Sequence, residues 1–214
     1  IATAIGEQSV KMILDPVSGA RMAVGEALTN LVFAAVRDIE EVKCSANWMW
    51  APKLEGEGAA LFDAAKAMSE AMIAIGIAVD GGKDSLSMAT VVGDELVKSP
   101  RELVISLYAA MEDSRRKVTP DTVMVGSKLV FIDLAGGKDR LGGSALAQVH
   151  SQLGNACADM ESPEYVKNGF LAVQQMLKED LILAGHDRSD GGLITTLLEM
   201  CFAGNHGLDI DIFG

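Results

Sequence analysis

The sequence is short of positive charge: 18 Lys and Arg residues face 30 Asp and Glu residues, a formal net charge of −12 at pH 7. Non-specific binding to nucleic acid or to an anionic membrane needs a positive surface, so neither partner is expected. Aromatic residues make up only 5% of the 214 residues, which argues against a stacking platform for single strands. An anionic small ligand would need a local positive pocket or bound metal ions.

Cysteine is also scarce. Cys44, Cys157 and Cys201 are widely separated and form no C-x-x-C pair, so zinc sites and disulfides are not expected. We expect buried or half-buried free thiols in a reducing compartment. No apolar run reaches the roughly 18 residues that span a bilayer, and no signal peptide opens the chain, so the predicted location is cytoplasmic.

The segments that are present alternate in a way typical of α/β (α+β) architecture. Apolar spacing predicts helices over 18–35, with Ser18 as the cap, and over 58–75, 144–153, 165–179 and 193–202. Strands are predicted over 41–48, 87–92, 103–111, 128–134 and 181–184, with a turn at Gly93-Asp94 joining the second to the third. The polar segment 112–122, with Pro120, is the predicted linker between domains over 1–120 and 121–214.

Both ends of the chain resemble cut ends. It begins with Ile1 rather than Met, and it stops directly after a strand-like segment over 208–212. We interpret the sequence as a piece of a longer polypeptide.

The most informative segment is 80–88, where an acid and two glycines follow an apolar run. Glycines let the backbone approach a phosphate closely, and a lysine adds a mobile positive charge. The spacing is not that of the Walker motif. The segment predicts a nucleotide-binding loop, although a solvated hairpin turn explains it about equally well; its candidate residues are Gly82, Lys83, Asp84 and Ser85.

Glu26 and Asn30 are four residues apart in the first predicted helix, so their side chains project from one face. Carboxylate and amide oxygens are suitable ligands for Mg²⁺. For the pair in isolation, an ordinary exposed helix face is the simpler interpretation.

Two further glycine pairs stand at helix starts. Gly142 and Gly143 precede Ser144, where free amides would favour an anion, although a tight loop capped by Ser144 is the simpler alternative. The segment 186–193 places Asp187, Ser189 and Asp190 before two glycines, which predicts a metal and phosphate site; His186 is expected to be structural. Together the acids predict a divalent metal such as Mg²⁺, and the glycine turns predict a polyphosphate ligand such as a nucleotide.

In order along the chain, the segments 24–30, 43–48, 82–88, 140–146 and 186–193 resemble the phosphoribosylformylglycinamidine synthase family. These purine-pathway amidotransferases use ATP and glutamine to convert formylglycinamide ribonucleotide to formylglycinamidine ribonucleotide. The resemblance implies an aminoimidazole ribonucleotide (AIR) synthetase-like two-domain unit, with an N-terminal α/β sandwich and the start of a C-terminal α/β domain. A phosphate-transfer enzyme of the wider superfamily, which includes selenophosphate synthetase and thiamine-monophosphate kinase, is the alternative.

The large form of the family carries two tandem copies of this unit and a glutaminase domain. The resemblance implies that this chain is the second copy, that its sheet pairs with that of the other copy, and that the isolated piece is inactive. It also implies metal ligands at Glu26, Asn30 and Asp187 and a nucleotide contact at Ser189. It does not indicate which of the two pseudo-symmetric pockets the segment 82–85 faces, and it assigns no catalytic residue.

Overall fold

A four-stranded sheet forms the centre of the computed structural model, which describes residues 1–122 and 124–211. The strand order is β1-β6-β2-β3. β6 (Glu102–Ala109) runs antiparallel to both β1 (Ala2–Glu7) and β2 (Lys43–Met49), whereas β3 (Ala78–Ser85) runs parallel to β2. β1 and β3 are therefore the two edges of this sheet.

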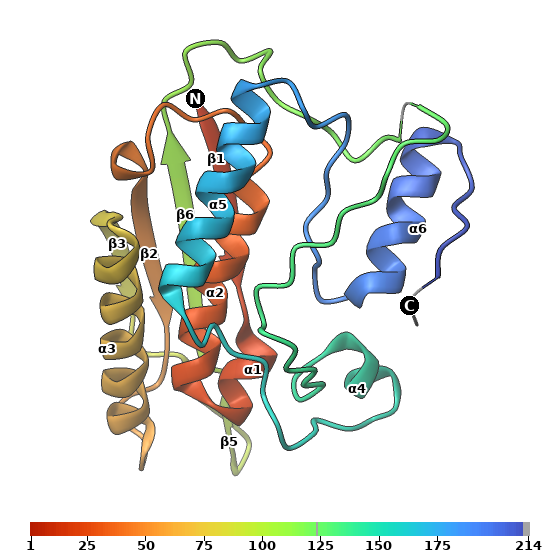
Figure 1. Cartoon of the computed structure of the whole chain (residues 1–214). Helices are drawn as coiled ribbons and strands as arrows, with labels where there is room; N and C mark the ends of the chain where they lie inside the picture. The colour runs from red at the N-terminus through yellow and green to blue at the C-terminus, as the bar shows by residue number, and fades with distance from the viewer. Residues whose placement is uncertain (123, 212–214) are drawn as a thin grey trace.

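Helices cover one face of the sheet (Figure 1): α2 (Pro16–Leu31), α3 (Glu57–Ile75) and α5 (Pro163–Lys178). Period-2 alternation in β6 fixes which face they cover, since Leu103, Ile105 and Leu107 are buried while Ser106 and Tyr108 between them are only half-buried. The opposite face, which we call the open face, has no helix over it among the described residues. The mixed α/β architecture predicted from the sequence is confirmed.

The start of α2 differs from the prediction. Asp15 is the N-cap and accepts a hydrogen bond from the backbone N–H of Val17 (3.0 Å), and Pro16 occupies the first turn. Ser18 does not cap the helix, because its hydroxyl donates to Asp15 Oδ2 (2.5 Å) instead. The short helix α1 (Ser9–Leu14), which leads into this cap, was not predicted.

A hairpin stands apart from the main sheet. The turn at Gly93-Asp94 joins β4 (Ala89–Val92) to β5 (Glu95–Lys98), and the prediction that it leads to β6 is wrong. β5 is too short and too polar to have stood out in the sequence. The strands predicted at 41–48 and 103–111 are confirmed as β2 and β6.

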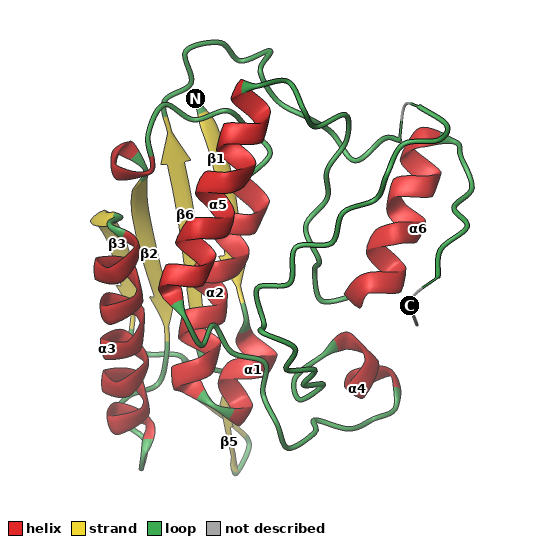
Figure 2. Cartoon of the chain, viewed as in Figure 1, coloured by secondary structure: helices red, strands yellow, loops and turns green. Residues whose placement is uncertain are grey.

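Beyond residue 112 the predicted helices are confirmed and the predicted strands are not. α4 (Ala145–Val149) and α6 (Gly192–Gly204) lie away from the sheet (Figure 2). The segments 128–134 and 181–184 form no strand, and Val130 is 76% exposed, because no neighbouring strand in the described chain completes their hydrogen-bond ladder. In the predicted terminal strand over 208–212, residues 208–211 form no strand either, and Ile212 lies outside the described residues.

α5 packs on the first half of the chain. Its Gln174 is 4% exposed, donates from Nε2 to the carbonyls of Val32 (2.7 Å) and Ala34 (3.0 Å), and accepts at Oε1 from the N–H of Val36 (3.0 Å). One side chain thus satisfies three backbone groups of the turn that follows α2. The helix is part of the core around α2 and α3, although it follows the predicted linker.

Candidate functional site

Glu26 and Asn30 lie on one face of α2, as their spacing predicts, and both contact β1. Glu26 Oε2 accepts from the N–H of Glu7 (2.7 Å) and from Gln8 Nε2 (2.9 Å), and Asn30 Nδ2 donates to the carbonyl of Ile5 (2.9 Å). Burial raises the pKa of Glu26, opposed by the two hydrogen bonds and reinforced by the charges of Asp190 and Glu7. One carboxylate oxygen of Glu26 and the amide oxygen of Asn30 are not used in these contacts.

Lys11 of α1 links Glu26 to the segment around Asp190. Its ammonium donates to Asp190 Oδ1 (2.6 Å) and to Gln8 Oε1, and Gln8 in turn donates to Glu26. Lys11 and Gln8 are both buried. Sequence reasoning missed both residues; the signal was a lysine inside the apolar run 10–14, where a charged side chain requires a partner.

The segment 186–191 leads into α6 without regular structure. His186 lies between two acids, with Nδ1 3.2 Å from Asp187 Oδ1 and Nε2 3.1 Å from Glu199 Oε2, which fits the predicted structural role. Asp187 is half-buried, and its carbonyl accepts from Thr196 Oγ1 (3.3 Å). Ser189 is exposed, and its carbonyl accepts from the N–H of Gly192 (2.9 Å). The segment therefore presents Ser189 and Asp190 towards solvent.

The glycine pair 142–143 forms the tight loop capped by Ser144 that was the alternative to a phosphate site. The N–H of Gly142 donates to the carbonyl of Ala156 (2.7 Å) and that of Gly143 to the carbonyl of Leu153 (2.8 Å), so neither amide is free for a phosphate. The confirmed cap is Ser144, whose Oγ accepts from the N–H of Ala147 (3.1 Å). A Cβ on Gly143 would lie 2.8 Å from Lys11 Cγ and 3.0 Å from its Cα, so this glycine permits close packing on Lys11.

The segment 80–85 is a strand and not a loop, and it lies at the opposite edge of the sheet from Glu26. Gly82 pairs with Ala46 in the parallel ladder, and a Cβ at Gly82 would overlap the Ala46 carbonyl oxygen. Lys83 pairs with Asn47 and lies on the open face, where Tyr108 also donates to Asp80. Neither predicted structure for this segment, a nucleotide-binding loop or a solvated hairpin turn, is found, because close strand packing also demands glycine.

The structure therefore brings three of the four predicted motifs together and leaves the fourth apart. Glu26, Gly143 and Asp190 meet at Lys11 through the hydrogen bonds, packing and ion pair described above. The segment 82–85, with Gly82, Lys83, Asp84 and Ser85, does not join them.

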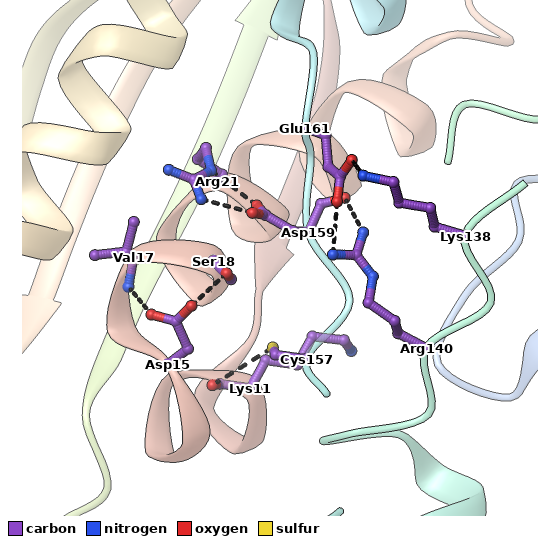
Figure 3. A network of polar contacts seen from close by, with 10 residues as sticks. All are labelled: Lys11, Asp15, Val17, Ser18, Arg21, Lys138, Arg140, Cys157, Asp159 and Glu161. Carbon is purple, nitrogen blue, oxygen red and sulfur yellow. Dashed lines mark hydrogen bonds and ion pairs between the residues drawn. The ribbon is translucent and has the colours of Figure 1, made fainter. Parts of the chain in front are cut away.

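A second polar network fastens the segment 138–161 to α2 (Figure 3). Arg21 makes two hydrogen bonds to Asp159 (2.8 and 2.6 Å), which lowers the pKa of Asp159 despite its burial. Arg140 lies 2.7 Å from Glu161, which also pairs with Lys138. Through the Arg21–Asp159 pair, the segment that contains the glycine pair is tied to α2, and sequence spacing gave no indication of this contact.

The cysteines follow the prediction. Cys44 is buried, Cys157 and Cys201 are half-buried, and all three are free thiols. Burial raises the pKa of Cys44 and of Cys157 to about 11.

In residues 1–122 and 124–211, no group of three or more His, Cys, Asp or Glu side chains is placed to hold a metal ion by itself. Within the same residues, no helix has both the length and the apolar character needed to cross a membrane.

Comparisons with known proteins identify the family. Residues 1–110 match the FGAR-AT PurM_N-like domain, and residues 124–213 match the C-terminal domain of AIR synthase related proteins. The chain is 58% identical to an Arabidopsis thaliana protein named probable phosphoribosylformylglycinamidine synthase, chloroplastic/mitochondrial, and 57% identical to the Homo sapiens phosphoribosylformylglycinamidine synthase. The chain belongs to the phosphoribosylformylglycinamidine synthase family.

Both alignments cover 99% of this chain, which spans only 15% and 16% of the length of these two synthases. Because the Arabidopsis synthase is named for two organelles, the cytoplasmic location of this family member stays a prediction. Among solved structures, T. maritima PurL complexed with FGAR matches with a TM-score of 0.64 at 13% identity, over 95% of this chain and 31% of that one. This match confirms the AIR-synthetase-like fold.

Proposed function

We propose that this chain is one nucleotide-binding unit of a larger ATP-dependent, glutamine-using ligase. The parent enzyme would convert formylglycinamide ribonucleotide to formylglycinamidine ribonucleotide in purine biosynthesis. Support comes from the synthase names of relatives that are 57–58% identical over nearly the whole chain. The pocket of this unit would have a structural or auxiliary role, and the isolated chain would be inactive as a ligase.

The observation that carries the nucleotide site is the convergence at Lys11. Glu26, Gly143 and Asp190 lie far apart in sequence, yet each contacts Lys11 directly or through Gln8. A buried ammonium that pairs with one acid and reaches a second through Gln8, at the junction of two halves of the chain, is typical of a binding site rather than of a core. In this proposal Ser189 contacts the nucleotide, and Gly142 and Gly143 shape the wall of the site.

The donor set fits a magnesium ion that is shared with phosphate. One oxygen each of Glu26 and Asn30 accepts no hydrogen bond from residues 1–122 or 124–211, and Asp187 would supply a carboxylate from the second half of the chain. Mg²⁺ commonly takes one or two carboxylates together with phosphate oxygens and water, so a cage made by the protein alone is not required. When bound, the ion would neutralise phosphate charge. In support, T. maritima PurL, which has the same fold, is known complexed with ATP.

The open face of the sheet is the proposed contact with the other AIR-synthetase-like unit of the parent. Ile5 on this face is 57% exposed, and the edge strand β3 presents unpaired backbone groups. Lys83 lies on this face, and we therefore propose that the segment 82–85 serves the pocket of the partner unit rather than the one beside Glu26. Ammonia would come from the glutaminase domain of the parent.

We retain the division into an N-terminal domain over 1–120 and a C-terminal domain over 121–214 as part of the proposal. α5 then docks the second domain on the first through Gln174. The candidate site lies at the same junction, because Lys11 belongs to the first domain and Asp190 to the second.

Calorimetric titration with ADP, with and without Mg²⁺, tests the proposal. We expect magnesium-dependent binding that is lost in Asp187→Asn and kept in Asp84→Asn, the matched control at the opposite edge of the sheet. Absence of ADP binding by the unmodified chain would overturn the assignment of a pocket to this unit. Turnover of ATP with a small acceptor by the chain alone would instead favour the phosphate-transfer alternative.

A further inference from the structure

Lys11 is the charged residue on which the candidate site is built. Its side chain is 7% exposed, and its ammonium has two acceptors, Asp190 Oδ1 at 2.6 Å and Gln8 Oε1. An ammonium that is removed from water requires compensating partners, because its desolvation costs several kcal/mol. Gln8 supplies a neutral oxygen, so within the described chain Asp190 is the one charged group that contacts the Lys11 ammonium directly.

The two sides of this ion pair differ in how firmly they are held. Lys11 lies in α1, with Gly143 packed against its Cα and Cγ and with Cys157 Sγ 3.8 Å from its carbonyl oxygen (Figure 3). Asp190 has a side chain that is 52% exposed, and it lies in the irregular segment before α6. A half-exposed carboxylate gains little from such a pair, so a stronger anion can take its place while Lys11 stays fixed.

The charge around the site shows why a cation is needed there. Glu7 and Glu26 lie beside it together with Asp190, in a chain whose net charge is −12. A polyphosphate would be repelled unless a positive group met it. Lys83, the lysine that the sequence suggested for this role, lies at the other edge of the sheet.

We propose that Lys11 is the phosphate-binding cation of this site, and that Asp190 holds its ammonium until the terminal phosphate of a nucleoside diphosphate replaces the carboxylate. The inference rests on the proposed nucleotide site and adds to it the residue that recognises the phosphate. Asp190 then competes with the nucleotide phosphate for the Lys11 ammonium and does not itself bind the nucleotide.

Calorimetric titration with ADP and with AMP in the presence of Mg²⁺ tests this role. Because a hydrogen bond to a charged group contributes about 1.5–3 kcal/mol, Lys11→Gln is expected to weaken ADP binding by about 10- to 100-fold. The affinity for AMP, which lacks the terminal phosphate of ADP, should fall much less in this variant. Lys66→Gln, at an exposed lysine of α3 that pairs with Glu70 and has no part in either pocket, is the control and should leave the dissociation constant for ADP unchanged.

Asp190→Asn provides a second variant, in which the isosteric carboxamide oxygen can still accept a hydrogen bond from Lys11. It should bind ADP more tightly than the unmodified chain, because the competing carboxylate is gone. Weaker ADP binding by Asp190→Asn would overturn the exchange. Unchanged binding by a folded Lys11→Gln would overturn the role of Lys11 while the nucleotide site stands, whereas absence of ADP binding by the unmodified chain overturns both.

Discussion

Glu57 holds together three parts of the first half of the chain, and its replacement is the sharpest test of the packing. Its side chain is 4% exposed; Oε2 accepts from Arg101 Nε (2.9 Å), and Oε1 accepts from Arg101 Nη2 (3.2 Å) and from Lys98 Nζ. Its carbonyl accepts from Trp50 Nε1 (3.1 Å). We therefore predict that Glu57→Gln loosens α3, the β4–β5 hairpin and the start of β6 together.

The magnitude follows from the charges around the carboxylate. Arg101 first, and then Lys98, lower the pKa of Glu57 from 4.5 to about 2, against the effect of burial. One pKa unit corresponds to about 1.4 kcal/mol, so the shift sets an upper value of about 3 kcal/mol. Because Lys98 is half exposed to solvent, which screens its share, we expect Glu57→Gln to lower the free energy of unfolding at pH 7 by about 2–3 kcal/mol.

The pH dependence has a definite sign. The folded-state pKa lies below the unfolded one, so the stabilisation is complete above about pH 4.5 and is lost as the pH falls towards 2. Urea unfolding followed by tryptophan fluorescence should show a large difference between the unmodified chain and Glu57→Gln at pH 7 and a small one at pH 2.5. Glu55→Gln, at an exposed position two residues away, is the control. Equal differences at both pH values would refute the reasoning.

Two further predictions concern close packing and a buried amide, both read as urea midpoints at pH 7. Gly82→Ala places a Cβ on the carbonyl oxygen of Ala46 and should destabilise the chain by more than about 2 kcal/mol. Gly81→Ala, whose added Cβ would have its nearest neighbour 3.9 Å away, should be tolerated, and equal effects of the two substitutions would contradict the strand assignment. Gln174→Leu removes the partner of three backbone groups, of which those of Val32 and Val36 are buried, and should cost about 2–4 kcal/mol. Gln175→Leu on the exposed face of α5 should cost less than about 0.5 kcal/mol, and similar losses would show that Gln174 does not dock α5.

The helices and the central strands were predictable because their signal is local. The period of apolar residues identified α3 and α5 to within a few residues, and the density of apolar and β-branched residues identified β6. The segment 128–134 has the same apolar density but forms no strand, because a strand also requires a neighbour to pair with. The amino-acid composition of a segment does not show whether a neighbouring strand is available to pair with it.

The candidate site was likewise predictable from the sequence only in part. The sequence by itself determined which residue types are present, and the i, i+4 spacing of Glu26 and Asn30 placed both on one face of α2. The tertiary structure alone decided that Lys11 rather than Lys83 lies beside Glu26 and Asn30, since the sequence by itself makes either lysine equally plausible. It also decided that Gly82 and Gly143 serve close packing, because the absence of a Cβ suits a phosphate and a neighbouring backbone equally, and only the fold determines which of the two is there.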